Sequence, residues 1–174
     1  MIRHYFEISG RPVPKKTPGE RKKEIVFDPK IERFCLQRPH FSRFNTQKKE
    51  MAEVQEQLKS QYLHVPLDQP LIVDYIFHIP ISKSWKTWQK HQALNGKLMH
   101  MQRPDVTNYV KFYEDCMTGI IYIDDCIIQV GTALKKWSQQ GKTQIFIREF
   151  TETELMEYIR RIQNGETGIV LPQD

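Results

Sequence analysis

Acidic residues and a lysine gather in one short part of this sequence, where their types and spacing could support phosphate chemistry. The stretch 103–116 reads RPDVTNYVKFYEDC and contains Asp105, Asn108, Lys111 and Asp115. The apolar run that follows, at 119–130, contains the adjacent acids Asp124 and Asp125. Hard cations such as Mg²⁺ bind to a few carboxylates together with water and substrate phosphates. A lysine close by can stabilise the charge that develops on a displaced phosphate.

A helix over residues 105–118 would place these side chains together. At about 100° per residue, one side of that helix is apolar and carries Val106, Tyr109, Val110, Tyr113, Cys116 and Met117. The opposite side carries Asp105, Asn108, Lys111 and Asp115. If the helix start packs against the start of the next strand, carboxylates from the two elements can meet. Geometry alone leaves two interpretations open, a metal site and an ordinary solvated helix side.

Two basic segments precede these acids. The loop 10–23 contains Lys15 and Lys16 and has a single acid, whereas the segment 82–103 has no acid at all. The second segment contains Lys83, Lys86, Lys90, Lys97 and Arg103, with Trp85, Trp88, His91 and His100 between them. Lysines without acids suit a phosphate backbone, and aromatic side chains can stack on bases. The alternatives are a solvated surface for the lysines and core packing for the tryptophans.

The remaining sequence predicts the elements that must position these residues. Apolar spacing predicts a helix at 45–63, with Met51, Val54, Leu58 and Tyr62 on one side, and strands at 2–9 and 71–81. One face of the second strand would carry Leu71, Val73, Tyr75, Phe77 and Ile79. A short helix should end near Leu94. The stretches 126–137 and 143–150 are predicted to form a hairpin through the turn SQQGK. A last helix should begin at Thr151, which forms a capping box with Glu154.

Bulk composition narrows the class of protein. The 174 residues suit one domain, and the net charge of +5 is modest. Three cysteines, an odd number with no CxxC pair, argue against a disulfide framework and against structural zinc. No secretory signal and no apolar run of about eighteen residues is visible. We therefore expect a cytoplasmic protein that has no membrane segment.

The acidic stretch resembles the signature of a known family. The residues RPDVTNYVK, then Asp115, then GIIYIDD resemble the motif of the RusA family of Holliday junction resolvases. That motif runs basic-Pro-Asp-x-Asp-Asn-x-x-Lys, then Asp, a short spacer and Asp-Asp. The segments GRPVPKK, IPISKSW and HMQRPD are also similar to the family. The resemblance is clearest over residues 1–150, and residues 151–174 are expected to form the C-terminal helix and tail of the same single domain.

The resemblance implies both a fold and an activity. The expected fold is a single RusA-like domain of the α/β class and α+β type, with a small, mixed, largely antiparallel sheet flanked by helices. The expected activity is endonuclease cleavage of four-way DNA junctions in recombination and repair. Such enzymes act as homodimers, use Mg²⁺ or Mn²⁺, and make paired nicks.

The resemblance also assigns roles to residues at the matching positions. Asp105 and Asp125, with Asp124 beside them, correspond to the metal ligands, and Lys111 corresponds to the catalytic lysine. Asn108 and Asp115 are expected to support the site. Expected DNA contacts are Lys15, Lys16, Lys83, Lys86, Lys90, Arg103, Lys135 and Lys136. In an extended strand, Lys135 lies roughly 33 Å from Asp125 and is therefore a DNA contact at most.

One position departs from the family motif. The second aspartate of the motif is replaced by Thr107, whose neutral hydroxyl is a much weaker ligand for a hard cation. Asp124 could compensate for the missing carboxylate. Alternatively, the protein binds junctions without cutting them, or it is a protein-interaction module that has no DNA role.

Overall fold

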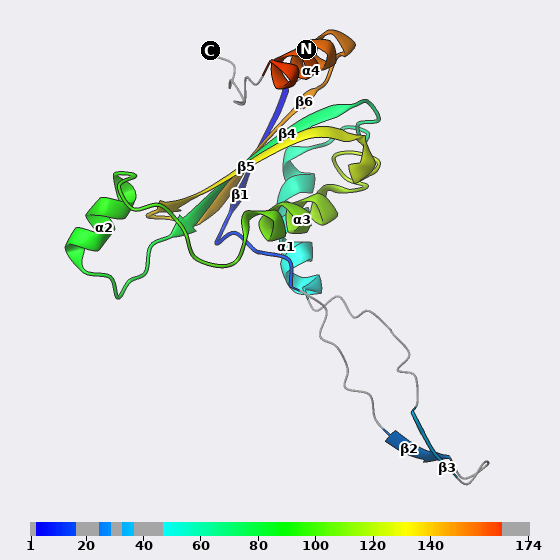
Figure 1. Ribbon diagram of the computed structural model, residues 1–174, viewed down its shortest axis with the longest axis vertical. Helices are drawn as coiled ribbons and strands as arrows, with labels where there is room; N and C mark the ends of the chain where they lie inside the picture. Colours follow the sequence, from blue (N-terminus) through cyan, green and yellow to red (C-terminus); the bar gives the residue numbers. More distant parts are fainter. Residues whose placement is uncertain (1–2, 17–24, 29–32, 37–46, 165–174) are drawn as a thin grey trace.

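The computed structural model describes residues 3–16, 25–28, 33–36 and 47–164. Its main sheet has four strands in the order β1-β6-β4-β5, and their bounds are Arg3–Ser9 (β1), Leu71–Pro80 (β4), Ile128–Ser138 (β5) and Lys142–Glu149 (β6). Strands β4 and β5 are parallel, whereas the other two pairings are antiparallel (Figure 1). The predicted mixed, largely antiparallel sheet of an α+β fold is therefore confirmed.

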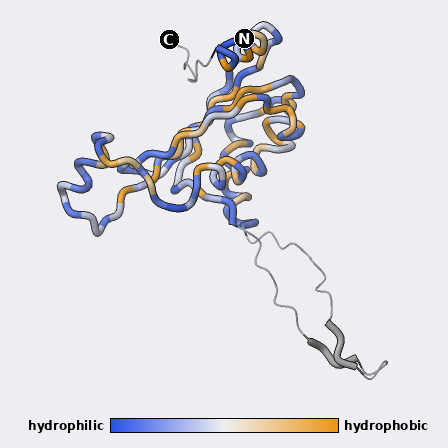
Figure 2. Tube along the Cα trace, viewed as in Figure 1, coloured by the Kyte–Doolittle hydropathy of each residue, from blue (hydrophilic) through white to orange (hydrophobic). Residues whose placement is uncertain are grey.

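Helices α1 (Lys48–Gln61) and α3 (Val106–Met117) lie on the same side of the sheet and contact each other (Figure 1). The core between helices and sheet contains alternate residues of β4, as predicted: Leu71, Val73, Tyr75, Phe77 and Ile79. Apolar colour in Figure 2 lies mainly along the strands and these helices. The core also contains Phe112, which the ideal helix did not assign to the apolar side.

The predicted hairpin between β5 and β6 is wrong, because β4 lies between these two strands. Strand β4 is buried along most of its length, so pairing on both edges satisfies its backbone. The three residues 139–141 cross over the end of β4, where Pro80 ends the strand. The amide of Ile81 donates to the carbonyl of Ser138 at 2.9 Å, which closes this crossing.

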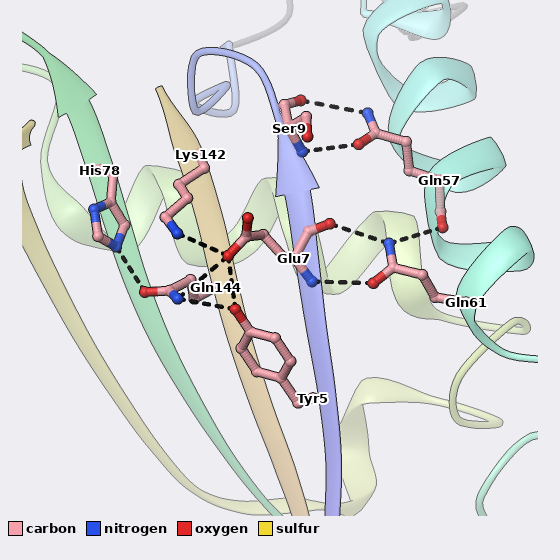
Figure 3. Close-up of polar contacts among 8 residues, drawn as sticks. All are labelled: Tyr5, Glu7, Ser9, Gln57, Gln61, His78, Lys142 and Gln144. Atoms are coloured by element: carbon pink, nitrogen blue, oxygen red, sulfur yellow. Dashed lines mark hydrogen bonds and ion pairs between the residues drawn. The ribbon is translucent and has the colours of Figure 1, made fainter. Parts of the chain in front are cut away.

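Helix α1 covers the outer edge of β1 with two glutamine side chains (Figure 3). The Gln61 side chain accepts from the Glu7 amide at 3.1 Å and donates to the Glu7 carbonyl at 3.1 Å. The Gln57 side chain makes the same pair of bonds with Ser9, at 2.8 and 3.4 Å. Glutamines one helical turn apart therefore satisfy backbone groups two residues apart on the strand.

The sheet face turned away from α1 and α3 carries a connected polar network (Figure 3). Lys142 forms an ion pair with Glu7 at 2.8 Å, and the Tyr5 hydroxyl donates to the same carboxylate at 2.7 Å. Gln144 donates to the Tyr5 hydroxyl at 2.9 Å, and its oxygen lies 2.7 Å from Nε2 of His78. Three strands are thus joined across this face by side chains.

The remaining elements lie outside the sheet and its two covering helices. They are the antiparallel pair β2 (Ile25–Asp28) and β3 (Arg33–Leu36), helices α2 (Thr87–Leu94) and α4 (Glu152–Gln163), and a 3₁₀ turn, η1 (Asp125–Ile127). The capping box of Thr151 and Glu154 is confirmed at the start of α4. In the described part of the chain, no helix is long and apolar enough to cross a membrane.

Candidate active site

The polar side of α3 begins at Asp105, which is the residue that precedes the first helical turn. Within the described residues its carboxylate makes no capping hydrogen bond to the helix backbone, and it is exposed. Thr107 and Lys111 are also exposed, and Asn108 is half-buried. Asp105, Thr107 and Lys111 are therefore exposed at a helix whose other side is in the core.

Lys135 connects β5 to the start of α3. Its ammonium donates to the carbonyl of Gln102 at 2.7 Å and to the carbonyl of Pro104 at 2.9 Å. Lys135 of the sheet therefore holds Pro104, the residue before Asp105, at the N-terminal end of α3. Side chains alternate along a strand, so Lys136 points to the opposite face of the sheet. On that face, burial lowers the pKa of His78, and the charge of Lys136 lowers it further.

Asn108 and Asp115 face a different neighbour, the segment that contains Lys15. The ammonium of Lys15 forms an ion pair with the Asp115 carboxylate. The backbone amide of Lys15 donates to the backbone carbonyl of Asn108 at 2.7 Å. Lys16 forms an ion pair with Glu50 of α1 at 3.4 Å. Both lysines predicted to contact DNA therefore also have acidic partners within the protein.

Asp124 and Asp125 lie at the start of η1, immediately before β5. The Asp124 carboxylate accepts from the Cys126 amide at 2.9 Å, and this hydrogen bond lowers the pKa of Asp124. Asp125 is exposed and begins the 3₁₀ turn. Asp124 thus caps the 3₁₀ turn, whereas the side chain of Asp125 is exposed to solvent.

Glu114 interacts electrostatically with Asp125, although the resemblance to the family motif did not select it. Burial raises the pKa of Glu114, Asp125 and Asp115 raise it further, and Lys111 lowers it. Glu114 is half-buried on α3 and lies three residues after Lys111. The spacing of Glu114 from Lys111 was the available signal, because residues three apart on a helix are neighbours.

The acid-free segment 82–103 reaches the site through β5. Trp85 packs edge-on against Trp137 at 4.7 Å between ring centroids, and His100 contacts the same ring at 4.2 Å. Trp88 of α2, in contrast, is 63% exposed. Trp85 therefore packs within the protein, whereas Trp88 is exposed and available to stack on a base.

The basic side chains of this segment lie mostly on its surface. Lys83, Lys86 and Arg103 are exposed, and Lys90 is half-buried. The Lys90 ammonium donates to the Lys83 carbonyl at 3.0 Å, so Lys90 also holds the start of the segment in place. Figure 1 shows α2 at one end of β4 and β5, away from α4.

The acidic side chains at α3 and at residues 124–125 are chemically suited to a hard cation, because such cations bind carboxylate oxygens. Among the residues that the structure describes, no group of three or more acidic, histidine or cysteine side chains is arranged to hold a metal ion. Mg²⁺, however, is often held by one or two carboxylates, with water and substrate phosphates completing its shell. Asp125 is an exposed carboxylate that meets this lesser requirement.

Comparison with known proteins agrees with the motif. The family model described as "Endodeoxyribonuclease RusA" matches residues 10–148. The chain is also 32% identical over 82 residues to a Bacillus subtilis (strain 168) protein described as "Uncharacterized protein YqaN". That match covers 46% of this chain and 58% of the relative, so it spans little more than half of the relative's length. Since the family model matches most of its residues, the chain belongs to the RusA endodeoxyribonuclease family.

Proposed function

We propose that the protein is a divalent-metal-dependent endonuclease that nicks four-way DNA junctions during recombination and repair. The observation that carries this proposal is the position of α3 within the family match. Its solvent-facing polar side follows directly on the acid-free segment 82–103, and Asp125, which precedes β5, interacts electrostatically with Glu114 of the same helix. Cationic side chains that hold DNA would thus lie beside carboxylates that hold a metal.

Each residue of the proposed site has a defined task. Asp105 and Asp125, with Asp124 beside the latter, are the proposed ligands of Mg²⁺ or Mn²⁺. The bound metal would polarise the scissile phosphate and activate a water molecule. Lys111 stabilises the negative charge that develops on the phosphate, and Asn108 and Asp115 fix the helix through their contacts with the Lys15 segment.

The proposed DNA contacts divide into two groups. Lys83, Lys86, Lys90 and Arg103 form the basic surface of the segment 82–103, and Trp88 lies exposed among them. Lys15, Lys16, Lys135 and Lys136, which lie outside that segment, form the second group. We further propose a homodimer, because two symmetric sites suit paired nicks in a symmetric junction.

The test is cleavage of a labelled four-way junction with Mg²⁺ or Mn²⁺. Asp105→Asn and Asp125→Asn should abolish nicking and retain junction binding, because an amide keeps the shape of the carboxylate without its charge. Glu157→Gln, on the exposed surface of α4, is the control. Normal cleavage by both aspartate variants would show that the metal ligands are assigned wrongly.

Exposed Thr107 favours a second function, junction binding without cleavage. In that case the wild-type protein binds junctions and leaves them intact, and Thr107→Asp gains nicking. Binding should weaken steeply as salt increases, since phosphate contacts release counterions. Salt-insensitive binding, or no binding at low salt, would instead support a protein-interaction role.

A further inference from the structure

Helix α4 exposes its apolar side. Leu155, Ile159 and Ile162 follow one another at spacings of four and three residues, and Met156 lies beside them, so these four side chains form one stripe along the helix. The exposed fractions of Leu155, Met156, Ile159 and Ile162 are 38%, 65%, 39% and 56%. An amphipathic helix ordinarily buries such a stripe against its own protein. In the described part of the chain, α4 has no buried residue.

A different side of α4 attaches the helix to the domain. Glu154, Tyr158 and Arg161 are half-buried, and they also follow one another at spacings of four and three residues. The Glu154 carboxylate forms an ion pair with Arg148 of β6 and completes the capping box with Thr151. The helix is therefore attached through the side that carries Glu154, and this attachment leaves the apolar stripe exposed.

The strand that leads into α4 carries further exposed apolar surface. Phe146 and Arg148 point to the face of the sheet turned away from α1 and α3, as does Tyr5 of β1. Tyr5 and Phe146 are 49% and 40% exposed, and their ring centroids lie 5.1 Å apart. A specific interface covers about 800 Å² on each partner, whereas one side of a 12-residue helix measures only about 18 by 10 Å. A partner of α4 therefore also needs neighbouring surface such as these two rings.

The charges of α4 identify a partner that fits the stripe. Glu152 and Glu154 lie in the first turn of the helix, and Arg160 and Arg161 lie in the last turn. Glu152, Met156 and Arg160 are four residues apart, so an apolar side chain lies between an exposed acid and an exposed base in one row. This row is complementary to a copy of itself that runs in the opposite direction, because each acid then faces a base. Antiparallel helix dipoles also attract each other, whereas a parallel copy would bring like charges together.

We propose that α4 pairs with α4 of a second copy of this chain in antiparallel orientation, with Met156 beside the two-fold axis. The exposed rings of Tyr5 and Phe146 extend the same isologous interface. Figure 1 shows α4 away from α2, so this pairing leaves the basic segment 82–103 open to DNA. Helix α4 follows the residues 10–148 that the family model matches, so this surface is specific to the chain. The proposal rests on the homodimer of the proposed function and gives it a surface, but its test needs no DNA.

Sedimentation equilibrium of the full-length protein without DNA measures the dissociation constant of the dimer. Met156→Lys should weaken dimerisation by at least about 10-fold, because a residue beside the two-fold axis is lost from both partners. Thr153→Lys adds the same charge at an exposed position of α4 outside the stripe, and it should change the dissociation constant by less than about 2-fold. A monomeric wild-type protein, or equal effects of the two lysines, overturns the inference.

An exchange of charges tests the antiparallel orientation. Glu152→Arg and Arg160→Glu should each weaken dimerisation by about 10-fold, because each brings like charges together. The double variant should restore the dissociation constant to within about 3-fold of wild type, since acid and base have exchanged places. Circular dichroism verifies that every variant is folded, and a folded double variant as weak as the single variants contradicts the pairing.

The dimer and the nuclease function can fail separately. A dimer that responds to these variants as expected but leaves four-way junctions intact upholds the inference and refutes the nuclease function. A monomer that nicks junctions supports the nuclease function and overturns the inference.

Discussion

Lys135 gives the sharpest test of how the sheet positions the start of α3, and the test variant is Lys135→Met. This change keeps the length of the side chain and removes the two hydrogen bonds to the carbonyls of Gln102 and Pro104. Hydrogen bonds to a charged group contribute about 1.5–3 kcal/mol each when they are well shielded. Because Lys135 is half-buried, we expect a combined loss of about 1–2 kcal/mol in the free energy of unfolding.

The effect on cleavage should exceed the effect on stability. Without the tether, Asp105 can move relative to the rest of the site, and a misplacement of about 1 Å can cost on the order of 100-fold in rate. We therefore expect nicking at saturating junction to decrease by about 10- to 100-fold. Urea denaturation measures the stability, and a single-turnover assay on a labelled junction measures the rate.

Lys136→Met is the matched control. It removes the same charge from the neighbouring position, but on the opposite face of the sheet, where Lys136 is exposed. We expect a change in unfolding free energy within about 0.5 kcal/mol and an effect on junction binding alone. If both variants lose equal junction affinity and neither loses stability, Lys135 is only a DNA contact and the tether is unimportant.

Three further outcomes follow from the structure. Burial lowers the pKa of His78 from its ordinary 6.5, so the unfolded chain binds more protons than the folded protein near that pH. The free energy of unfolding, measured in urea, should therefore decrease from about pH 7.5 to 5.5. The decrease should be smaller in His78→Gln. Trp88→Ala should weaken junction binding, measured by fluorescence anisotropy, by about 1–3 kcal/mol if Trp88 stacks on a base, with no loss of stability. Gln61→Ala should lower the unfolding free energy by about 1 kcal/mol, because it uncovers both backbone groups of Glu7.

Each of these outcomes has a result that would contradict it. An unchanged pH dependence in His78→Gln would mean that other groups control the acid response. A loss of stability in Trp88→Ala would show that this ring packs within the protein. For Gln61→Ala, Lys59→Ala on the exposed side of α1 is the control, and equal effects of the two variants would remove any special role for the strand edge.

Periodicity in the sequence was sufficient for the elements that are stabilised by their own apolar side. Leu58 on α1, Phe77 on β4 and Tyr113 on α3 are fully or almost fully buried, as spacings of two, three and four residues predicted. The spacing signal is strong here because each element buries one continuous side. The parallel pairing of β4 with β5 did not follow from periodicity, since pairing between distant strands leaves no local pattern.

The candidate site, like the fold, could be predicted from the sequence only in part. The motif located Asp105, Lys111 and Asp125 by resemblance, and the structure then related them to their neighbours. Two relations were beyond the sequence: Lys135 reaches the start of α3, and Asp125 interacts electrostatically with Glu114. Both depend on how α3 packs across β5, which is set by tertiary contacts between segments far apart in the chain.

The position of β4 between β5 and β6 has a consequence for the order in which the chain folds during synthesis. Ile76 of β4 pairs with Leu134 on one side and with Gln144 on the other, so both partners come from the last third of the chain. Until that part emerges from the ribosome, β4 presents two unpaired apolar edges, which are prone to association with other chains. Folding of the sheet therefore waits for the end of β6, and a chain cut short before Lys142 would leave one edge of β4 unpaired and aggregation-prone.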